Sequence, residues 1–298
     1  MTILLRDDSL DLQSCFRACQ VALRNEAPEL NRRLLFAGEG LRTDAAPVLL
    51  WIVLALRTSG VDAKDFEGRR RRSDLARELE AAASGQAVSP LGRALHGGAT
   101  RRGLDLSGLA GLSSALDDEL QVSVFETRDE VLAHARRRSE AVSEIFDALF
   151  GRPSERSRVL ARSLGVGLQL SAWCRDFGRD WTRGRLMLPM EDLRACGVTL
   201  AQLSSGAPDD GFRRFLVREA AWARTWIAKG WELCGEWSHV RGRVLAFHLR
   251  RELFRLAALE QLGQRALREA PRASRFGTLF AGLATLGPRG LPRPLRDS

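Results

Sequence analysis

The sequence predicts an all-α protein, and three observations support this fold class. Ala, Leu, Arg and Glu recur at helical spacing along almost the whole chain, whereas alternating β-branched segments are scarce. The breaks between helical segments are short and rich in Gly and Pro. No repeat of about 20 to 50 residues is visible, which disfavours a solenoid. We therefore expect a single helical domain over residues 1–286, followed by a Pro- and Arg-rich tail over 287–298.

Each expected helix is a run of apolar residues three or four positions apart, bounded by residues that helices avoid. The breaks are Pro28, Gly38-x-Gly40, 84–90, Gly97-Gly98, Gly151-Arg152-Pro153, 184–189 and 205–208. The helices between them are 9–25, 43–58, 72–83, 105–121, 127–150, 155–181, 190–204, 209–233 and 239–267, with a last one near 274–285. No break is long enough for an interdomain linker.

The formal net charge of +9 would ordinarily indicate a nucleic acid or another anionic partner. Lys64 and Lys229 are the only lysines, so arginine supplies nearly all of the positive charge. No zinc knuckle, RNP-like or helix-turn-helix pattern accompanies it, so we expect no nucleic-acid binding. Anionic lipid or diphosphate partners fit the charge equally well.

The N-terminal sequence MTILLRDDSLDLQ carries acidic residues where a signal peptide would be basic and then apolar. The longest apolar run, Pro47 to Leu56, has about ten residues, whereas a bilayer-spanning helix needs about 20. We therefore expect a cytoplasmic protein. Peripheral association with the inner membrane through an apolar surface helix stays open.

The segment 166–198 indicates a functional site. Asp176 and Asp180 are four residues apart, so on an α-helix their carboxylates share one face. Leu168 and Leu170, one to two turns earlier, indicate that this face is largely buried. Two buried carboxylates this close to each other require a cation. That cation is either a bound metal ion or the neighbouring arginines of a salt-bridged helix end.

This segment resembles the second aspartate-rich region of the squalene/phytoene synthase family, which reads approximately LQLTNxxxDVxxDxxxGRxYLPxEDLxxxGV. The residues in register are Leu168-Gln169-Leu170, Asp176, Asp180, Gly184-Arg185, Leu188-Pro189, Glu191-Asp192-Leu193 and Gly197-Val198. The spacing from Asp180 to Arg185 is most similar to the hopanoid-cluster, hydroxysqualene synthase branch, and Phe125 to Gly151 resembles a helix of that branch. The resemblance is weaker over the rest of the chain.

The resemblance implies a single-domain isoprenoid synthase fold, a helical bundle around a central apolar cavity. In such enzymes Mg²⁺ ions bridge carboxylates to a prenyl diphosphate and neutralise the leaving group as an allylic cation forms. Asp176 and Asp180 would then be the catalytic metal ligands. The expected diphosphate-binding residues are Arg57, Arg175, Arg183 and Arg185.

The first aspartate-rich motif of the family, A-R-T-x-D-D-x-x-D, has its counterpart at 56–65, which reads LRTSGVDAKD. A shift of one residue would place Asp62 and Asp65 over its last two aspartates, and would require an insertion or a bulge. In the direct register the three aspartates become Gly60, Val61 and Lys64. A lysine at a ligand position repels Mg²⁺, so the upstream half of the metal site is rewritten.

Further departures lie around the second motif. Ala172 stands where the family has Asn, Arg179 where many members have Glu, and Met187 where Tyr is usual. The helix that normally reads Ser-Ala-Asn-Pro or Val-Ala-Gly-Thr reads Arg138-Ser139-Glu140-Ala141. Charge therefore replaces small residues that line the cavity in the family.

Two functions are consistent with this pattern. In the first, the protein acts on prenyl diphosphates in isoprenoid biosynthesis, with Lys64 or Arg57 replacing the charge of one Mg²⁺ on the diphosphate. In the second, catalysis is impaired and the protein is an isoprenoid-diphosphate binder or a non-catalytic partner. The retained Asp176 and Asp180 favour the first function, and the loss of the upstream aspartates favours the second. A homodimer and pairing with a paralogue both stay open.

Overall fold

The computed structural model describes residues 10–34, 38–59, 65–119 and 124–271. Within these residues every regular element is a helix, and a single parallel bridge between Val124 and Leu186 is the only β pairing. The all-α prediction is confirmed. The helix expected near 274–285 and the tail over 287–298 lie outside the described residues.

The chain divides into two compact units. The first comprises Met1–Gln121 and Glu144–Gly151, and the second comprises Val122–Ser143 and Arg152–Ser298. The long helix α7 (Arg128–Phe150) contributes to both, because its first part belongs to the second unit and its last part to the first. A single domain over 1–286 stays a prediction.

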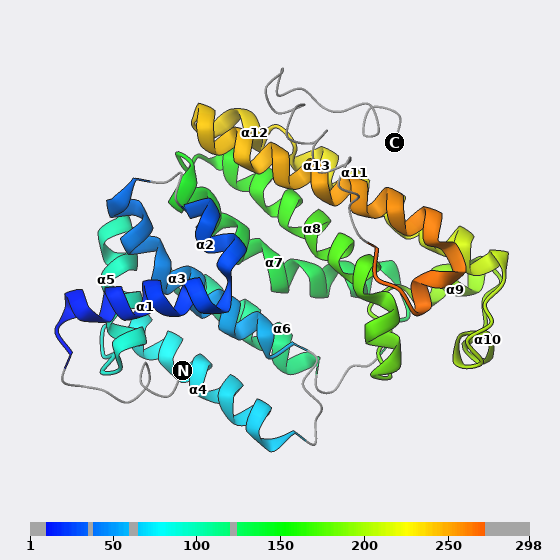
Figure 1. Ribbon diagram of the computed structural model, residues 1–298, viewed down its shortest axis with the longest axis horizontal. Helices are drawn as coiled ribbons and strands as arrows, with labels where there is room; N and C mark the ends of the chain where they lie inside the picture. Colours follow the sequence, from blue (N-terminus) through cyan, green and yellow to red (C-terminus); the bar gives the residue numbers. More distant parts are fainter. Residues whose placement is uncertain (1–9, 35–37, 60–64, 120–123, 272–298) are drawn as a thin grey trace. The chain divides into compact units, whose positions relative to one another are not determined.

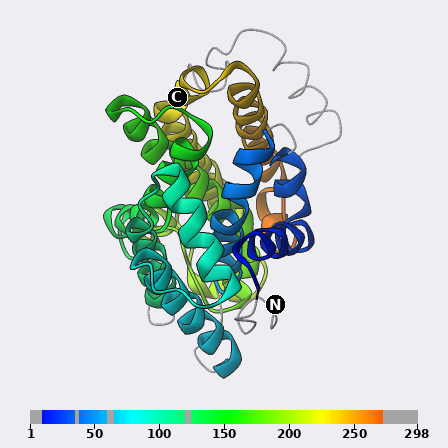
Figure 2. The same cartoon turned by 90° about the vertical axis from the view of Figure 1, so that its left-hand side faces the viewer.

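The first unit is built around α3, which packs against α1, α4 and α5 (Figure 1; Figure 2 faces the left-hand side of the same view). Its core residues include Leu49, Leu50 and Trp51, and the Trp51 indole donates to the carbonyl of Leu75 across 2.9 Å. The helices of this unit before α7 are α1 (Leu12–Glu26), α2 (Pro28–Leu34), α3 (Glu39–Arg57), α4 (Phe66–Ala83), α5 (Pro90–Arg102), η2 (Ser107–Leu109) and α6 (Ala110–Asp118).

The apolar run Pro47–Leu56 lies within α3, and most of its side chains are buried in the first unit. The run therefore belongs to the hydrophobic core of the first unit, and this burial accounts for its apolar composition. Among the described residues, no helix is both long enough and apolar enough to cross a bilayer.

The helix α5 was not expected, because Gly97-Gly98 was interpreted as a break. Its start has the features of a helix N-terminus, since the Ser89 hydroxyl accepts from the Gly92 amide and Pro90 follows directly. At Gly98 a Cβ atom would lie 2.5 Å from the backbone oxygen of Asp44. The glycine is thus required for close packing of α5 on α3, which local propensity cannot reveal.

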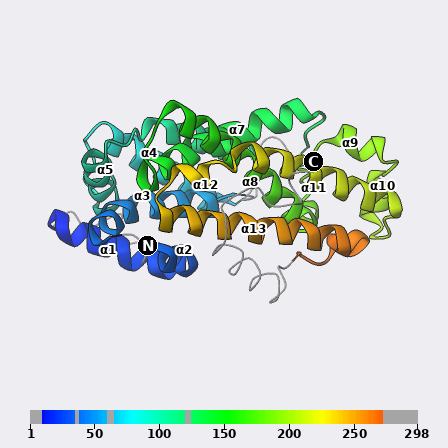
Figure 3. The same cartoon turned by 90° about the horizontal axis from the view of Figure 1, so that it is seen from above.

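In the second unit α8, α11 and α13 pack lengthwise on one another, with α11 antiparallel to α8, as seen from above in Figure 3. Phe177 of α8 packs against Phe212 and Phe215 of α11, with ring centroids 5.2 and 5.9 Å away. This aromatic cluster fixes the helix that carries Asp176 and Asp180. Besides the first part of α7, the unit contains α8 (Glu155–Thr182), α9 (Met190–Ala195), α10 (Leu200–Ser204), α11 (Asp210–Gly230), α12 (Leu233–Glu236), α13 (His239–Leu262) and η3 (Gly263–Leu267).

The helix expected over 190–204 is two short helices, α9 and α10, separated by a turn at Gly197. Thr199 begins the second one, because its hydroxyl accepts from the Gln202 amide while Gln202 bonds back to the Thr199 amide. The apolar spacing continues across the turn and so predicts one helix where the capping box begins a second.

Candidate functional site

The candidate site lies near the C-terminal end of α8, a helix of 28 residues. The helix begins with a capping box between Ser154 and Ser157 and ends at Thr182, and Gly184 just beyond it has a φ of 71°, in the left-handed region. The chain turns back at this glycine, and the Arg185 amide donates to the carbonyl of Asp180 across 2.9 Å. The Gly-Arg sequence therefore returns the Arg185 side chain to the aspartates.

Asp180 is the more buried of the two carboxylates. It is 4% exposed, and its Oδ1 accepts from Arg185 Nη2 at 2.9 Å. The Arg185 side chain is itself only 11% exposed. This buried ion pair places one carboxylate firmly on the inner side of the helix end.

Asp176 is partly exposed and is held by its neighbour in the sequence. Arg175 donates from Nε to Oδ1 at 3.2 Å and from Nη2 to Oδ2 at 3.0 Å, which makes a bidentate pair. Burial would lower the pKa of Arg175, but hydrogen bonding and the charges of Asp176, Glu252 and Asp180 raise it above its ordinary value. Arg175 is therefore a permanent cation.

Arg179 contacts both carboxylates. Its Nη2 lies 2.9 Å from Asp176 Oδ2, and its Nε lies 3.9 Å from Asp180 Oδ1. It is also the most exposed arginine of the group, with 57% of its side chain accessible. The two aspartates thus share a cation, as their spacing requires, and that cation belongs to the protein.

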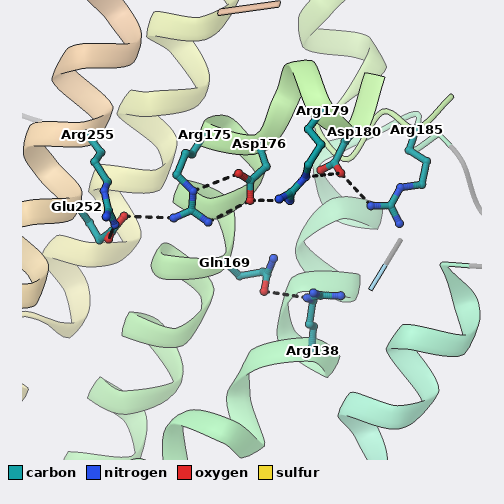
Figure 4. Close-up of polar contacts among 9 residues, drawn as sticks. All are labelled: Arg138, Gln169, Arg175, Asp176, Arg179, Asp180, Arg185, Glu252 and Arg255. Atoms are coloured by element: carbon teal, nitrogen blue, oxygen red, sulfur yellow. Dashed lines mark hydrogen bonds and ion pairs between the residues drawn. The ribbon is translucent and has the colours of Figure 1, made fainter. Parts of the chain in front are cut away.

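A third carboxylate, Glu252 of α13, extends the group. It is buried, lies 3.7 Å from Arg175 Nη1 and also pairs with Arg255. Figure 4 shows the resulting row of alternating charges. We call this row the α8 charge ladder; its members are Arg255, Glu252, Arg175, Asp176, Arg179, Asp180 and Arg185. Four guanidinium groups and three carboxylates give the ladder a net charge of +1.

A separate polar pair lies below the ladder in Figure 4. Arg138 of α7 donates from Nε to Gln169 Oε1 of α8 at 2.9 Å, and only 7% of Arg138 is exposed. Gln169 precedes Asp176 by two helical turns and lies on the same face of α8. The unusual charge at Arg138 is thus buried against the helix that carries the aspartates.

Glu252 and Arg255 were not expected from the sequence. They belong to a charged helix with no motif around them, and they reach the site because α13 packs on α8. Their spacing of three residues on one helix face was the one local sign of an ion pair.

Comparison with known proteins identifies the group to which this chain belongs. The profile of the squalene/phytoene synthase family matches residues 24–277. The chain belongs to the squalene/phytoene synthase family. The resemblance found in the α8 motif is therefore confirmed over most of the chain.

Several curated relatives of this family are similar to the chain. The bifunctional protein CrtB/UppS of Streptomyces coelicolor is 28% identical over 222 residues, which cover 72% of this chain and 38% of that protein. Phytoene synthase of Thermus thermophilus is 29% identical over 173 residues, which cover 56% of this chain and 58% of the relative. The chain thus spans less than two thirds of the length of these relatives.

Solved structures of the family share the fold. Squalene synthase HpnC from Alicyclobacillus acidocaldarius matches with a TM-score of 0.76 at 22% identity, over 85% of this chain and 95% of that one. A dehydrosqualene synthase matches with a TM-score of 0.80 at 16% identity, over 94% and 98%. The expected isoprenoid synthase fold is confirmed.

The counterpart of the family's first aspartate-rich motif lies in the first unit and is described only at its edges. Asp62 and Lys64 lie outside the described residues. Asp65 is exposed at the start of α4, where its Oδ1 accepts from the Gly68 amide at 2.9 Å. Arg57 ends α3 and binds the Glu26 side chain and backbone oxygen. The roles predicted for Arg57 and Asp65 stay predictions, and each residue also has a local structural partner.

Two charged side chains near this motif are buried within the first unit. Arg72, in the second turn of α4, is buried against Thr58 and Leu116, although Arg69–Arg71 before it are exposed. Glu119, directly after α6, is buried and accepts from the Ser59 hydroxyl at 2.9 Å. In both cases packing within the first unit buries a charge that the sequence pattern places on the surface.

Arg183, also expected to bind diphosphate, is exposed at the C-cap of α8. It lies one residue before Gly184 on the helix end that carries Asp180 and Arg185. Its predicted role rests on this position in the family motif and stays a prediction.

The family's EDL sequence contributes to a second buried charge cluster, formed by Asp192 of α9 and Glu219 of α11. Asp192 is contacted by Arg128 at 2.5 Å and by Arg218 at 2.8 Å. Glu219 is fully buried, and Arg128 Nη2 lies 3.7 Å from its Oε1. Burial, followed by the hydrogen bond and charge of Asp192, raises the pKa of Glu219 to about 9. Glu219 is therefore protonated at neutral pH.

Proposed function

We propose that this protein acts on prenyl diphosphates in isoprenoid biosynthesis, as a prenyltransferase or terpene-synthase-type enzyme that assists ionisation of an allylic diphosphate. One observation carries the proposal: the α8 charge ladder places Asp176 and Asp180 side by side among arginines at the family's second motif. The spacing from Asp180 to Arg185 resembles that of the hopanoid-cluster branch, and squalene synthase HpnC shares the fold.

The residues of the ladder fit a divalent cation that is bound together with a diphosphate. Among the described residues, no group of three or more His, Cys, Asp or Glu side chains is placed to hold a metal alone. Mg²⁺ is commonly held by one or two carboxylates plus substrate phosphate oxygens, and Asp176 and Asp180 supply such oxygens. When bound, Mg²⁺ would neutralise the diphosphate as it leaves.

The chain's own residues have separate tasks in this proposal. Arg175 and Arg185 orient the two aspartates through the bonds described above. Arg179 and Arg183 are exposed at the same helix end and can donate to diphosphate oxygens as planar forks. The site therefore combines two carboxylates for a cation with guanidinium groups for an anion.

The proposal is tested by incubating the protein with farnesyl, geranylgeranyl or presqualene diphosphate and Mg²⁺. Mass spectrometry then measures extractable hydrocarbon and released diphosphate. We expect turnover by the wild type and a fall of about a hundredfold or more in Asp176→Asn. The matched control is Asp74→Asn, because Asp74 makes a similar i,i+3 pair with Arg77 on α4. Unchanged turnover in Asp176→Asn would remove the site assignment.

The same incubation distinguishes the alternative function. A folded protein that binds diphosphate but turns over none of the three substrates would be a binder or a non-catalytic partner. The loss of the upstream aspartates at Gly60, Val61 and Lys64 is the observation in favour of this alternative. A homodimer, a paralogous partner and contact with a membrane stay predictions.

A further inference from the structure

Arg179 differs from the other arginines of the α8 charge ladder in its contacts. Arg175 pairs bidentately with Asp176, and Arg185 pairs with Asp180. Arg179 alone of the α8 arginines reaches both aspartates, at 2.9 Å and 3.9 Å. Its guanidinium therefore bridges the carboxylate pair, as a shared cation would.

Arg179 also differs in its exposure. Its side chain is 57% exposed, whereas that of Arg185 is 11% exposed and that of Arg175 is 30% exposed. An exposed ion pair contributes little to stability and is readily exchanged. Arg179 is thus the cation of the ladder that can turn from the aspartates to an anion arriving from solvent.

Arg179 also determines the net charge at this helix end. Arg175 and Arg185 balance Asp176 and Asp180, so without Arg179 these four groups have no net charge. Arg179 adds one positive charge at the point where the two carboxylates meet.

We propose that Arg179 is a resident cation that substitutes for one divalent ion at the Asp176 and Asp180 pair, so that diphosphate binds there without Mg²⁺. This inference rests on the proposed function, since it concerns the same site. The guanidinium fork matches two diphosphate oxygens, and its charge is carried by the chain and needs no metal. Mg²⁺ alone must displace Arg179 in order to reach both carboxylates.

The first experiment measures binding of inorganic diphosphate by calorimetry in the presence of EDTA. We expect the wild type to bind, and Arg179→Gln to bind about tenfold more weakly, because one charge-assisted contact is lost. The matched control is Arg158→Gln, because Arg158 is an exposed arginine of α8 paired with Glu155, far from the ladder. This control should bind like the wild type.

The second experiment titrates Mg²⁺ alone into the same proteins. Arg179→Gln should bind Mg²⁺ several-fold more tightly than the wild type, since the bridging guanidinium no longer competes. Misfolding would weaken the binding of both ligands. A weaker affinity for diphosphate together with a tighter affinity for Mg²⁺ therefore excludes misfolding. Equal diphosphate binding by Arg179→Gln and the wild type in EDTA would overturn the inference.

The outcomes separate this inference from the proposed function. If the wild type binds diphosphate only when Mg²⁺ is present, Arg179 is no substitute for a metal, while the prenyl-diphosphate function stands. If the wild type binds diphosphate neither with nor without Mg²⁺, the site assignment fails and the inference fails with it. Diphosphate binding that occurs without metal and depends on Arg179 supports both the inference and the proposed function.

Discussion

Arg185 donates from Nη2 to Asp180 Oδ1 across 2.9 Å, and both side chains are almost fully buried. The contact exists because Gly184 reverses the chain directly after α8. An ion pair of this kind orients its carboxylate, and breaking it leaves a buried charge without compensation. The family motif Gly-Arg therefore has a structural task in addition to any contact with substrate.

Replacing Arg185 should destabilise the protein. We expect Arg185→Met to lower the free energy of unfolding by about 2–4 kcal/mol, because Asp180 would lose its buried partner. Urea denaturation measures the change. The control Arg158→Met removes an exposed pair with Glu155 at 3.9 Å and should cost less than about 0.5 kcal/mol. Equal effects of the two substitutions would contradict this account.

Gly184→Ala should cost about 1 kcal/mol of stability, because the residue has a φ of 71° that other residues adopt with strain. No atom lies within 4 Å of the added Cβ, so backbone conformation is the whole effect. The control is Gly235→Ala, which also meets nothing within 4 Å but lies in α12 without a positive φ. That substitution should be neutral or stabilising. Thermal unfolding of both variants checks the prediction.

Glu219→Gln should change the pH dependence of stability. The pKa of Glu219 is raised in the folded state from 4.5 to about 9. The stability that the protonated side chain contributes is therefore fully present below about pH 4.5 and is lost as the pH rises through about 9. Between pH 5 and 9 the wild type should therefore lose stability relative to the variant, by at most about 1.4 kcal/mol per pH unit. Urea denaturation across this range measures the difference.

The groups facing Glu219 determine how steep this dependence is. Burial is the largest cause of the raised pKa of Glu219, and Asp192 raises it further. The positive charges of Arg128 and Arg218 lower the pKa of Glu219. The control Glu232→Gln affects an exposed carboxylate paired with Arg156 and should leave the profile parallel to that of the wild type. A parallel profile for Glu219→Gln would show that Glu219 titrates normally.

Glu252→Gln should strengthen the binding of inorganic diphosphate in EDTA by about threefold. The substitution removes a negative charge 3.7 Å from Arg175 and raises the net charge of the ladder by one. Calorimetry measures the affinity, with Glu236→Gln on α12 as a control. Weaker binding by Glu252→Gln would show instead that Glu252 acts mainly by holding Arg175 in place.

Much of the fold was predictable because most helices carry a continuous apolar spacing. The expected helices over 127–150 and 155–181 agree closely with α7 and α8. By contrast, α5 was missed because Gly97-Gly98 has low helix propensity, and only its close contact with Asp44 explains the glycine. Local helix propensity predicts a helix correctly where side chains separate it from its neighbours. The prediction fails where two helix backbones must approach closely, because glycine is then required within the helix.

The site divides in the same way between local pattern and packing. The pairing of Asp176 with Asp180 follows from helical periodicity, which is a local property of the chain. Periodicity contains no information about distant segments, so the contribution of Glu252 from α13 and the burial of Glu219 depend on tertiary packing.

The amino-acid sequence was sufficient to establish the helical class, the family and the carboxylate pair, since each depends on residue types at short spacing. Which cation meets that pair was decided only in three dimensions. Helix geometry allows a metal ion or an arginine between Asp176 and Asp180 equally well. In the folded protein Arg175 pairs with Asp176 and Arg185 pairs with Asp180, and both arginines are largely buried. The position between the two carboxylates is therefore occupied by the exposed Arg179.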